Sequence, residues 1–479
     1  MKLSQLVAVE KDVEITGISV DSRNVKKGNL FICIKGEHYD GHDYVMQALE
    51  KGAVAVVTQR RLGVPGEIVL PDTRRAAASI YSAWYHNPQN DLKVFGVTGT
   101  NGKTSVVNIL NSIYTKAGYR CGTSGTLGSF WCGKSKPSEN TTDPPELLYE
   151  TLRNMADDGV EYLFTEVSSH SLALERVSEI SFECGIYTNL TQDHLDFHGT
   201  MENYACAKAK LFEQCKLGIF NYDDINSYIA SQNCSCRACG YGKSALADYR
   251  VTNILKDSLD GIAYKADTPV GSLVIESHLS GEFNIMNTLA AAAAAVENGI
   301  DPECVVRAIS EFRGVPGRLE KIYNSDYTVI IDYAHTPDAL ARTLGALCEY
   351  AGKDKQKRRM RVLFGCGGDR DRGKRPLMGE IAEGLSDEVI VTSDNPRSEP
   401  PLSIIDDILA GMKKKKGALI VEPDRKKALE YVIDSAQKGD IILVAGKGHE
   451  TYQIDASGKH AFLERGILLD RISRRNCAT

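Results

Sequence analysis

A glycine-rich turn between an apolar run and a helical pattern constrains this chain more than any other stretch. Val94, Phe95 and Val97 predict a short buried strand. The turn Gly-Thr-Asn-Gly-Lys-Thr follows at residues 99–104, and apolar side chains then recur at helical spacing from residue 106. Strand, glycine turn and helix is the layout of a phosphate-binding loop, whose backbone N–H groups and helix N-terminus face phosphate oxygens.

This loop predicts a nucleotide site, with Lys103 reaching the outer phosphates and the Thr104 hydroxyl holding Mg²⁺. The general pattern has its first glycine where this chain has Val97, which Gly96 precedes. An ordinary glycine turn is the competing interpretation. The position of Gly-Lys-Thr between strand and helix favours nucleotide binding.

Length and composition narrow the class of protein. A chain of 479 residues predicts about three domains of roughly 150 residues each. The net charge of −6 gives no reason to expect nucleic acid as a partner. No run approaches ~18 apolar residues and the first residues form no signal peptide, so we expect no membrane span. The 13 cysteines lack a disulfide framework, which favours the cytosol.

The order of expected strands and helices predicts an α/β protein of three domains. Residues 1–90 read as a small α/β domain, and residues 91–316 as the nucleotide domain with a mostly parallel sheet. From residue 317 the pattern strand, loop, helix repeats, which is typical of a doubly wound, Rossmann-like sheet.

Polar side chains follow the expected strands of the central domain, at the ends where α/β sheets bind ligands. Glu166 ends one strand and suits Mg²⁺, which prefers oxygen ligands. Residues 193–198 contain two Asp and two His, a density more typical of a site than of a turn. Lys208, judged alone, reads as a solvent-facing cation on the helix that starts at residue 201.

A cysteine-rich stretch, Cys234, Cys236 and Cys239, is a weak zinc candidate because a fourth ligand at the usual spacing is missing. We expect a surface loop there.

The expected strands of the C-terminal domain end in glycines and charged groups at one sheet edge, which predicts a second ligand site.

Six motifs together resemble the Mur ligase family over essentially the whole chain and in its three-domain order. They are the loop at 99–104, Glu-Val-Ser-Ser-His at 166–170, Asn-Leu-Thr-Gln-Asp-His at 189–194, Tyr-Ala-Cys-Ala-Lys at 204–208, Asp-Tyr-Ala-His at 332–335 and Asp-Asn-Pro-Arg at 394–397. The resemblance implies a monomeric enzyme of bacterial peptidoglycan synthesis in the cytoplasm. It would use ATP and Mg²⁺ to add meso-diaminopimelate to UDP-N-acetylmuramoyl-L-alanyl-D-glutamate.

The resemblance also implies roles for individual residues. ATP would contact Gly99, Thr100, Asn101, Gly102, Lys103, Thr104, Ser105, Asn284, Asn287, Arg318 and Asp332. Mg²⁺ would be held by Thr104, Glu166, His194 and a carbamylated Lys208. The resemblance thus replaces the interpretation of Lys208 as a solvent-facing cation. The UDP-sugar dipeptide would contact Ser22, Glu37, His38, Tyr39, Asn140, Thr141, Thr142, Ser168 and Arg176. Leu174 stands where the family commonly has Gln, which removes one expected hydrogen bond.

The incoming amino acid would contact Arg370, Asp394, Asn395, Pro396, Arg397, Gly446 and Glu450. Arg397 favours diaminopimelate over lysine as the incoming amino acid. A guanidinium binds the second carboxylate of diaminopimelate bidentately, and lysine has no second carboxylate. We expect an acyl phosphate intermediate, formed with Lys103 offsetting phosphoryl charge, and His335 as a candidate base. Lysine-adding and folylpolyglutamate-type ligases, and a nucleotide-dependent switch without ligase chemistry, remain alternatives.

Overall fold

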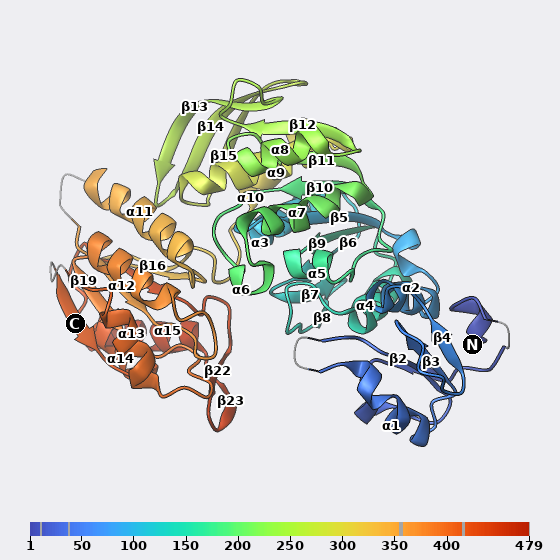
Figure 1. Cartoon of the computed structure of the whole chain (residues 1–479). Helices are drawn as coiled ribbons and strands as arrows, with labels where there is room; N and C mark the ends of the chain where they lie inside the picture. The colour runs from blue at the N-terminus through green and yellow to red at the C-terminus, as the bar shows by residue number, and fades with distance from the viewer. Residues whose placement is uncertain (10–11, 37–38, 354–357, 414–416, 479) are drawn as a thin grey trace.

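A computed structural model describes residues 1–9, 12–36, 39–353, 358–413 and 417–478, and Figure 1 shows them as three lobes, each with its own sheet. Helices accompany every sheet, which confirms the predicted α/β fold class. The expected boundaries near residues 90 and 316 remain predictions. No helix within the described ranges is long and apolar enough to cross a membrane.

The N-terminal lobe contains a four-stranded parallel sheet. Its elements are β1 Gly17–Ser19, β2 Asn29–Ile32, α1 Val45–Glu50, β3 Ala55–Thr58, β4 Glu67–Val69 and α2 Thr73–Trp84. Helix α2 packs on α4 of the central lobe, where Tyr81 and Leu152 belong to one buried apolar cluster. This shared core joins the first two lobes.

The central lobe contains an eleven-stranded sheet in the order β15-β14-β13-β12-β11-β10-β5-β9-β6-β7-β8, parallel in its middle and antiparallel at both ends. Its strands are β5 Lys93–Thr98, β6 Cys121–Gly125, β7 Gly128–Trp131, β8 Lys134–Lys136, β9 Tyr162–Glu166, β10 Phe182–Tyr187, β11 Cys215–Asn221, β12 Arg237–Gly242, β13 Tyr249–Ser258, β14 Gly261–Thr268 and β15 Gly271–Ser277. Its helices are α3 Lys103–Lys116, α4 Pro145–Asp157, α5 Ser169–Ala173, α6 Leu195–His198, α7 Met201–Ala209, α8 Ile225–Asn233, α9 Glu282–Glu297 and α10 Pro302–Glu311.

Helix α9 packs closely on α3, the helix that follows the phosphate loop. The alanine run of α9 is fully buried, as are Ile109, Leu110 and Ile113 of α3. Small side chains let the two helices approach each other. The start of α3, and with it the loop, is therefore anchored in the core of the lobe.

Strand β10 ends at Tyr187, and the side chains of Thr188 and Asn189 bond the Asn101 carbonyl, at 2.6 and 3.1 Å. Helix α7 ends at Ala209, and a 3-10 turn covers residues 210–214. One expectation needs correction. The Cys-rich stretch is not all surface loop: Cys239 is buried in β12, and burial raises the pKa of the Cys236 thiol to about 12. Among the described residues, no group of three or more His, Cys, Asp and Glu side chains is placed to hold a metal ion.

The C-terminal lobe contains a six-stranded sheet in the order β16-β17-β21-β18-β19-β20, parallel except for the edge strand β16. Its elements are β16 Glu320–Asn324, β17 Thr328–Asp332, α11 Pro337–Lys353, β18 Met360–Phe364, α12 Lys374–Leu385, β19 Glu388–Val391, α13 Pro401–Leu409, β20 Ala418–Val421, α14 Arg425–Asp434, β21 Ile441–Ala445, the hairpin β22 Tyr452–Asp455 and β23 Gly458–Ala461, and α15 Glu464–Ala478. Separate apolar clusters cover the two faces, one with α11, α12 and α13, the other with α14 and α15. The predicted doubly wound arrangement is confirmed.

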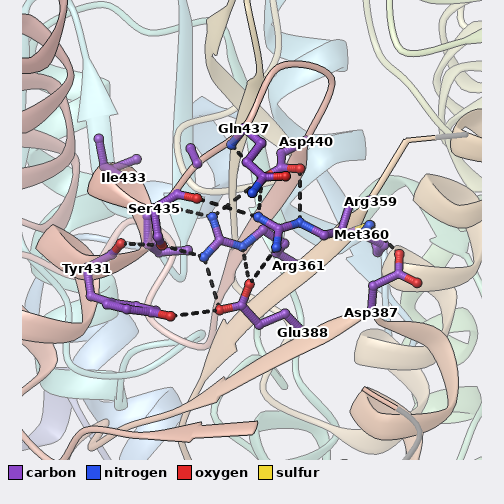
Figure 2. A network of polar contacts seen from close by, with 12 residues as sticks. Arg359, Met360, Arg361, Asp387, Glu388, Tyr431, Ile433, Ser435, Gln437 and Asp440 are labelled. Carbon is purple, nitrogen blue, oxygen red and sulfur yellow. Dashed lines mark hydrogen bonds and ion pairs between the residues drawn. The ribbon is translucent and has the colours of Figure 1, made fainter. Parts of the chain in front are cut away.

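A buried ionic network ties together the amino-terminal ends of β18, β19 and β21 (Figure 2). Arg361, which is 0% exposed, donates to Glu388 in two bonds of 2.7 and 3.1 Å and lies 3.5 Å from Asp440. Arg359 donates to Asp440 at 2.7 Å, so two cations balance two carboxylates. Arg361 also reaches α14 through the Val432 carbonyl at 3.0 Å.

We expect Arg361→Met to destabilise the C-terminal lobe strongly, because it leaves buried carboxylate charge without compensation. The free energy of unfolding should fall by about 3–5 kcal/mol, measured by native-state hydrogen exchange of the β18 and β21 amides. Arg474→Met is the control, because Arg474 pairs with Asp470 in solvent, and it should change stability by less than about 0.5 kcal/mol. Equal effects of the two variants would contradict the role of the network.

Candidate functional site

A cavity of about 390 Å³ lies between the central and C-terminal lobes. Its wall includes most of the residues predicted for ATP, two predicted for Mg²⁺ (Glu166 and His194) and the candidate base His335; those predicted for ATP are Thr100, Asn101, Gly102, Lys103, Thr104, Ser105, Asn284, Asn287, Arg318 and Asp332. Lys208 and Gly99 lie just behind this wall, joined by a bond of 2.8 Å from Lys208 Nζ to the Gly99 carbonyl. The structure thus gathers residues from both lobes around one space.

The phosphate loop needs glycine at two positions. Gly99 and Gly102 have φ of +139° and +90°. A β-carbon at Gly99 would lie 1.9 Å from the Thr188 hydroxyl, and one at Gly102 would lie 2.5 Å from Asn287 Oδ1. The backbone can therefore turn here only without side chains.

Lys103 lies over its own loop. Its ammonium donates to the carbonyls of Gly99 and Thr100 at 2.9 and 3.0 Å. Enclosure by the cavity lowers the pKa of Lys103, and the nearby Glu166 carboxylate opposes this effect. A poorly solvated cation at the start of a helix is well placed to attract phosphate.

Oxygen atoms that could bind a metal ion lie together beside Lys103. Thr104 Oγ1 donates to Glu166 Oε1 at 3.0 Å, and Arg318 from the C-terminal lobe donates to Thr104 Oγ1 at 3.0 Å. Thr126 donates its N–H and its hydroxyl to the two Glu166 oxygens at 2.9 and 3.1 Å. A buried hydroxyl and carboxylate side by side are hard donors that fit Mg²⁺. The sequence reasoning missed Thr126, which no motif marks.

Lys208 is only 1% exposed, although on its residue type alone it would be expected in solvent. Its ammonium lies 4.4 Å from the centre of the Tyr204 ring. Burial first, and the charge of Lys103 second, hold the pKa of Lys208 well below its usual value. A lysine with such a pKa is neutral more often, and a neutral amine is a nucleophile.

Two histidines line the cavity. His194 has φ of +54° and lies with Nε2 3.3 Å from Asp193 Oδ2; its side chain is 47% exposed, and the protein around the ring lowers its pKa. His335 Nδ1 lies 2.9 Å from the Tyr333 carbonyl; its side chain is exposed at the cavity wall, and the protein around the ring lowers its pKa to about 4. At neutral pH His335 is therefore uncharged.

One carboxylate of the C-terminal lobe contacts the phosphate loop directly. Asp338 Oδ2 accepts from Asn101 Nδ2 at 2.9 Å and from Thr191 Oγ1 at 3.1 Å. Asp338 lies in the first turn of α11, after the strand exit of β17. The sequence analysis did not select it, and only its place near a helix start after a predicted strand exit could have drawn attention.

The residues predicted for the sugar dipeptide surround the end of β9. Thr142 Oγ1 donates to the Glu166 carbonyl at 2.8 Å and accepts from the Ser168 N–H at 3.0 Å. Arg176 donates to the Thr142 carbonyl at 2.7 Å, and burial lowers the pKa of Arg176. Thr141 lies 3.2 Å from Thr126 through their hydroxyls. This group therefore adjoins the Glu166 carboxylate.

The remaining dipeptide candidates are more dispersed. Asn140 is exposed at the loop before α4. In the N-terminal lobe, Ser22 is buried and donates to Gln47 Oε1 at 2.7 Å, whereas Tyr39 is 74% exposed. Glu37 and His38 lie outside the described residues.

The C-terminal candidates meet at the carboxyl ends of β18, β19 and β21. Arg397 has φ of +54° and donates to the Gly368 carbonyl at 2.7 Å. Burial, and then the charge of Arg370, lowers the pKa of Arg397, so the two cations lie close together. Gly446 permits a close approach, since a β-carbon there would lie 2.8 Å from Asp394 Oδ2. Asn395 donates to Glu450 at 2.9 Å, and Pro396 lies between Asn395 and Arg397.

An ion pair braces the two loops that carry Arg370 and Arg397. Arg375, which is fully buried, donates to both Glu399 oxygens at 2.7 and 2.9 Å. Glu399 also accepts from the Asp369 N–H at 2.6 Å. Hydrogen bonds from Arg375 hold the pKa of Glu399 at about 2.

This pair predicts a pH dependence. The Glu399 carboxylate contributes stability fully above its ordinary pKa of 4.5, and the contribution is lost as the pH falls towards about 2. The stability difference between the wild type and Glu399→Gln should therefore be largest near pH 7 and smaller at pH 3, in chemical denaturation. A carboxyl NMR titration of Glu399 with a midpoint near 4.5 would contradict a stabilising ion pair between Arg375 and Glu399.

The chain matches known protein families and known proteins along most of its length. Family models described as "Mur ligase family, catalytic domain", "Mur ligase middle domain" and "Mur ligase, glutamate ligase domain" match residues 14–91, 97–295 and 317–448. The chain is 41% identical to a UDP-N-acetylmuramoyl-L-alanyl-D-glutamate–2,6-diaminopimelate ligase of Geobacillus thermodenitrificans, over 96% of both chains. It is 43% identical to the protein of that name from Clostridioides difficile, over 97% of this chain and 96% of the relative.

Solved structures agree with these matches. A structure of a UDP-N-acetylmuramoyl-L-alanyl-D-glutamate–2,6-diaminopimelate ligase superposes with a TM-score of 0.71 at 34% identity, over 99% of both chains. A MurF ligase from Thermotoga maritima in complex with ADP shares the fold, with a TM-score of 0.60 at 18% identity over 95% of this chain and 96% of that one.

Proposed function

Because this chain belongs to the Mur ligase family, we propose that it is an ATP-dependent ligase of peptidoglycan precursor synthesis. It joins meso-diaminopimelate by an amide bond to the D-glutamyl γ-carboxylate of UDP-N-acetylmuramoyl-L-alanyl-D-glutamate. The observation that carries this proposal is the cavity in which the phosphate loop faces Arg318 and His335 of the C-terminal lobe. We further propose that it works as a monomer in the bacterial cytoplasm.

The reaction needs two substitution steps. The γ-carboxylate attacks the γ-phosphate of ATP, which forms an acyl phosphate and releases ADP. Lys103 and the loop N–H groups at the start of α3 offset the charge on the transferring phosphoryl group. The amine of diaminopimelate then attacks the acyl carbon, and the tetrahedral intermediate expels phosphate to leave the amide.

Thr104, Glu166 and His194 would hold Mg²⁺, together with Lys208 if it is carbamylated. Bound there, Mg²⁺ supplies positive charge to the phosphate oxygens. The contact of Arg318 with Thr104 brings a further cation to the same hydroxyl from the C-terminal lobe. Thr126 orients the Glu166 carboxylate by occupying both of its oxygens.

His335 is the candidate base for the amine, which must be neutral to attack. Its lowered pKa keeps the imidazole uncharged at neutral pH, so a ring nitrogen is available to the amine, but the same shift makes His335 a weak proton acceptor. The contacts of Asp338 with Asn101 and Thr191 hold the C-terminal lobe against the phosphate loop. Such closure excludes water, which would otherwise hydrolyse the acyl phosphate.

Carbamylation of Lys208 requires the neutral amine that its lowered pKa favours. The neutral nitrogen bonds to the carbon of CO₂ and releases one proton, which converts the amine into a carbamate anion whose oxygens suit Mg²⁺. We expect a carbamate carbon signal in ¹³C NMR after incubation with ¹³C-bicarbonate, and its loss in Lys208→Arg. The same spectrum from both proteins would rule the modification out.

The function is tested by ADP release with ATP, Mg²⁺ and UDP-N-acetylmuramoyl-L-alanyl-D-glutamate, adding meso-diaminopimelate or L-lysine separately. We expect turnover only with diaminopimelate, and none in Lys103→Ala. Arg397→Met should lower kcat/KM for diaminopimelate about 10- to 100-fold, because a charged hydrogen-bonding group is worth about 1.5–3 kcal/mol. Arg465→Met, which removes an exposed arginine that pairs with Glu320, is the control and should leave kcat/KM unchanged.

The other outcomes separate the alternatives. Turnover with lysine alone would keep the family and overturn the role of Arg397. ATP hydrolysis that is independent of any amino acid would instead favour a nucleotide-dependent switch.

A further inference from the structure

A buried lysine lies behind the candidate amino-acid pocket and has no part in the mechanism above. Lys447 follows Gly446 at the carboxyl end of β21 and is 0% exposed. Burial of an ammonium group is costly unless hydrogen-bonding partners compensate it. Its partners therefore indicate what the lysine does.

Two pocket residues compensate Lys447. Its ammonium donates to Asn395 Oδ1 at 3.1 Å and to Glu450 Oε2 at 3.0 Å. Asn395 Nδ2 donates to the same Glu450 oxygen at 2.9 Å. Lys447, Asn395 and Glu450 thus form a closed triangle of hydrogen bonds.

These hydrogen bonds permit only one orientation of the Asn395 amide. Asn395 Oδ1 accepts from Lys447 and also from the Ile454 N–H of β22 at 2.9 Å. A rotated amide would turn its NH₂ group towards two donors and its oxygen towards the Glu450 carboxylate. Every contact would then be repulsive, so Lys447 fixes which side of the amide meets Glu450.

The same hairpin connects this orientation to Arg397. The Ile454 carbonyl accepts the Arg397 N–H at 3.1 Å, while its N–H serves Asn395. Gln453 Nε2 donates to the Asp394 carbonyl at 2.7 Å. The hairpin thus holds both ends of the loop 394–397, including the left-handed backbone of Arg397.

We propose that Lys447 is a positioning residue of the amino-acid pocket, which holds the Asn395 amide and the Glu450 carboxylate in their binding orientation. The proposal rests on the proposed function for the identity of the ligand, meso-diaminopimelate. Lys447 also balances the Glu450 charge, so the pocket presents an oriented acceptor without a net negative charge from this pair.

Lys447→Met tests the proposal in the full-length enzyme, with Arg361→Met as matched control. Both variants remove a fully buried cation from the same sheet, but Arg361 lies at the opposite edge, among Glu388 and Asp440. In the ligand-free protein, Lys447→Met should speed hydrogen exchange of the Ile454 amide, since its acceptor becomes free to rotate. It should raise KM for diaminopimelate roughly 10- to 100-fold, the loss typical of removing a group that orients a ligand-binding residue. KM for ATP should change little.

Arg361→Met should leave KM for diaminopimelate unchanged and, because it lowers the stability of the whole lobe, should speed the exchange of Ile454 no more than that of the β18 and β21 amides. Unchanged KM for diaminopimelate in a folded Lys447→Met protein would overturn the proposal, and so would equal effects of the two variants on KM and on Ile454 exchange. If the wild type does not use diaminopimelate at all, the proposed function fails, and the Ile454 exchange rate alone decides whether Lys447 orients Asn395.

Discussion

The close packing of the phosphate loop against the end of β10 is the constraint on which the rest of the site depends. Thr188 occupies the space that a side chain at Gly99 would need, and its hydroxyl bonds the Asn101 carbonyl. With the loop backbone held in this way, the Gly99 carbonyl accepts from both Lys103 and Lys208. Burial first, and the charge of Lys103 second, lower the pKa of Lys208, which gives Lys208 its neutral fraction.

Buried ions lie at both ends of the strands of the C-terminal sheet, and the two groups have different roles. At the amino-terminal edge, Arg361 and Glu388 tie strands together far from the cavity. At the carboxyl edge, Arg425 donates to the carbonyls of Ser393 and Ala445, the residues that precede Asp394 and Gly446. The first network supports the fold, whereas the second holds the strand ends from which the candidate pocket is built.

Contacts between the two larger lobes make one cavity from two half-sites. Arg318 and Asp338 each reach a residue of the phosphate loop or its neighbour α3. Because these two contacts are polar, ligands in the cavity can replace them with hydrogen bonds of their own.

Local patterns in the sequence determined the strand, turn and helix of the phosphate loop, the doubly wound C-terminal sheet and the charged strand ends, because each depends on neighbouring residues. Tertiary structure alone decided that Lys208 lies behind Gly99, 109 residues away, and that Asp338 contacts Asn101, 237 residues away. Sequence spacing carries no information on such contacts, since the packing of whole elements creates them. The burial of Lys447 belongs to the same class, because lysine is rarely buried and only the assembled fold supplies the partners that compensate its charge.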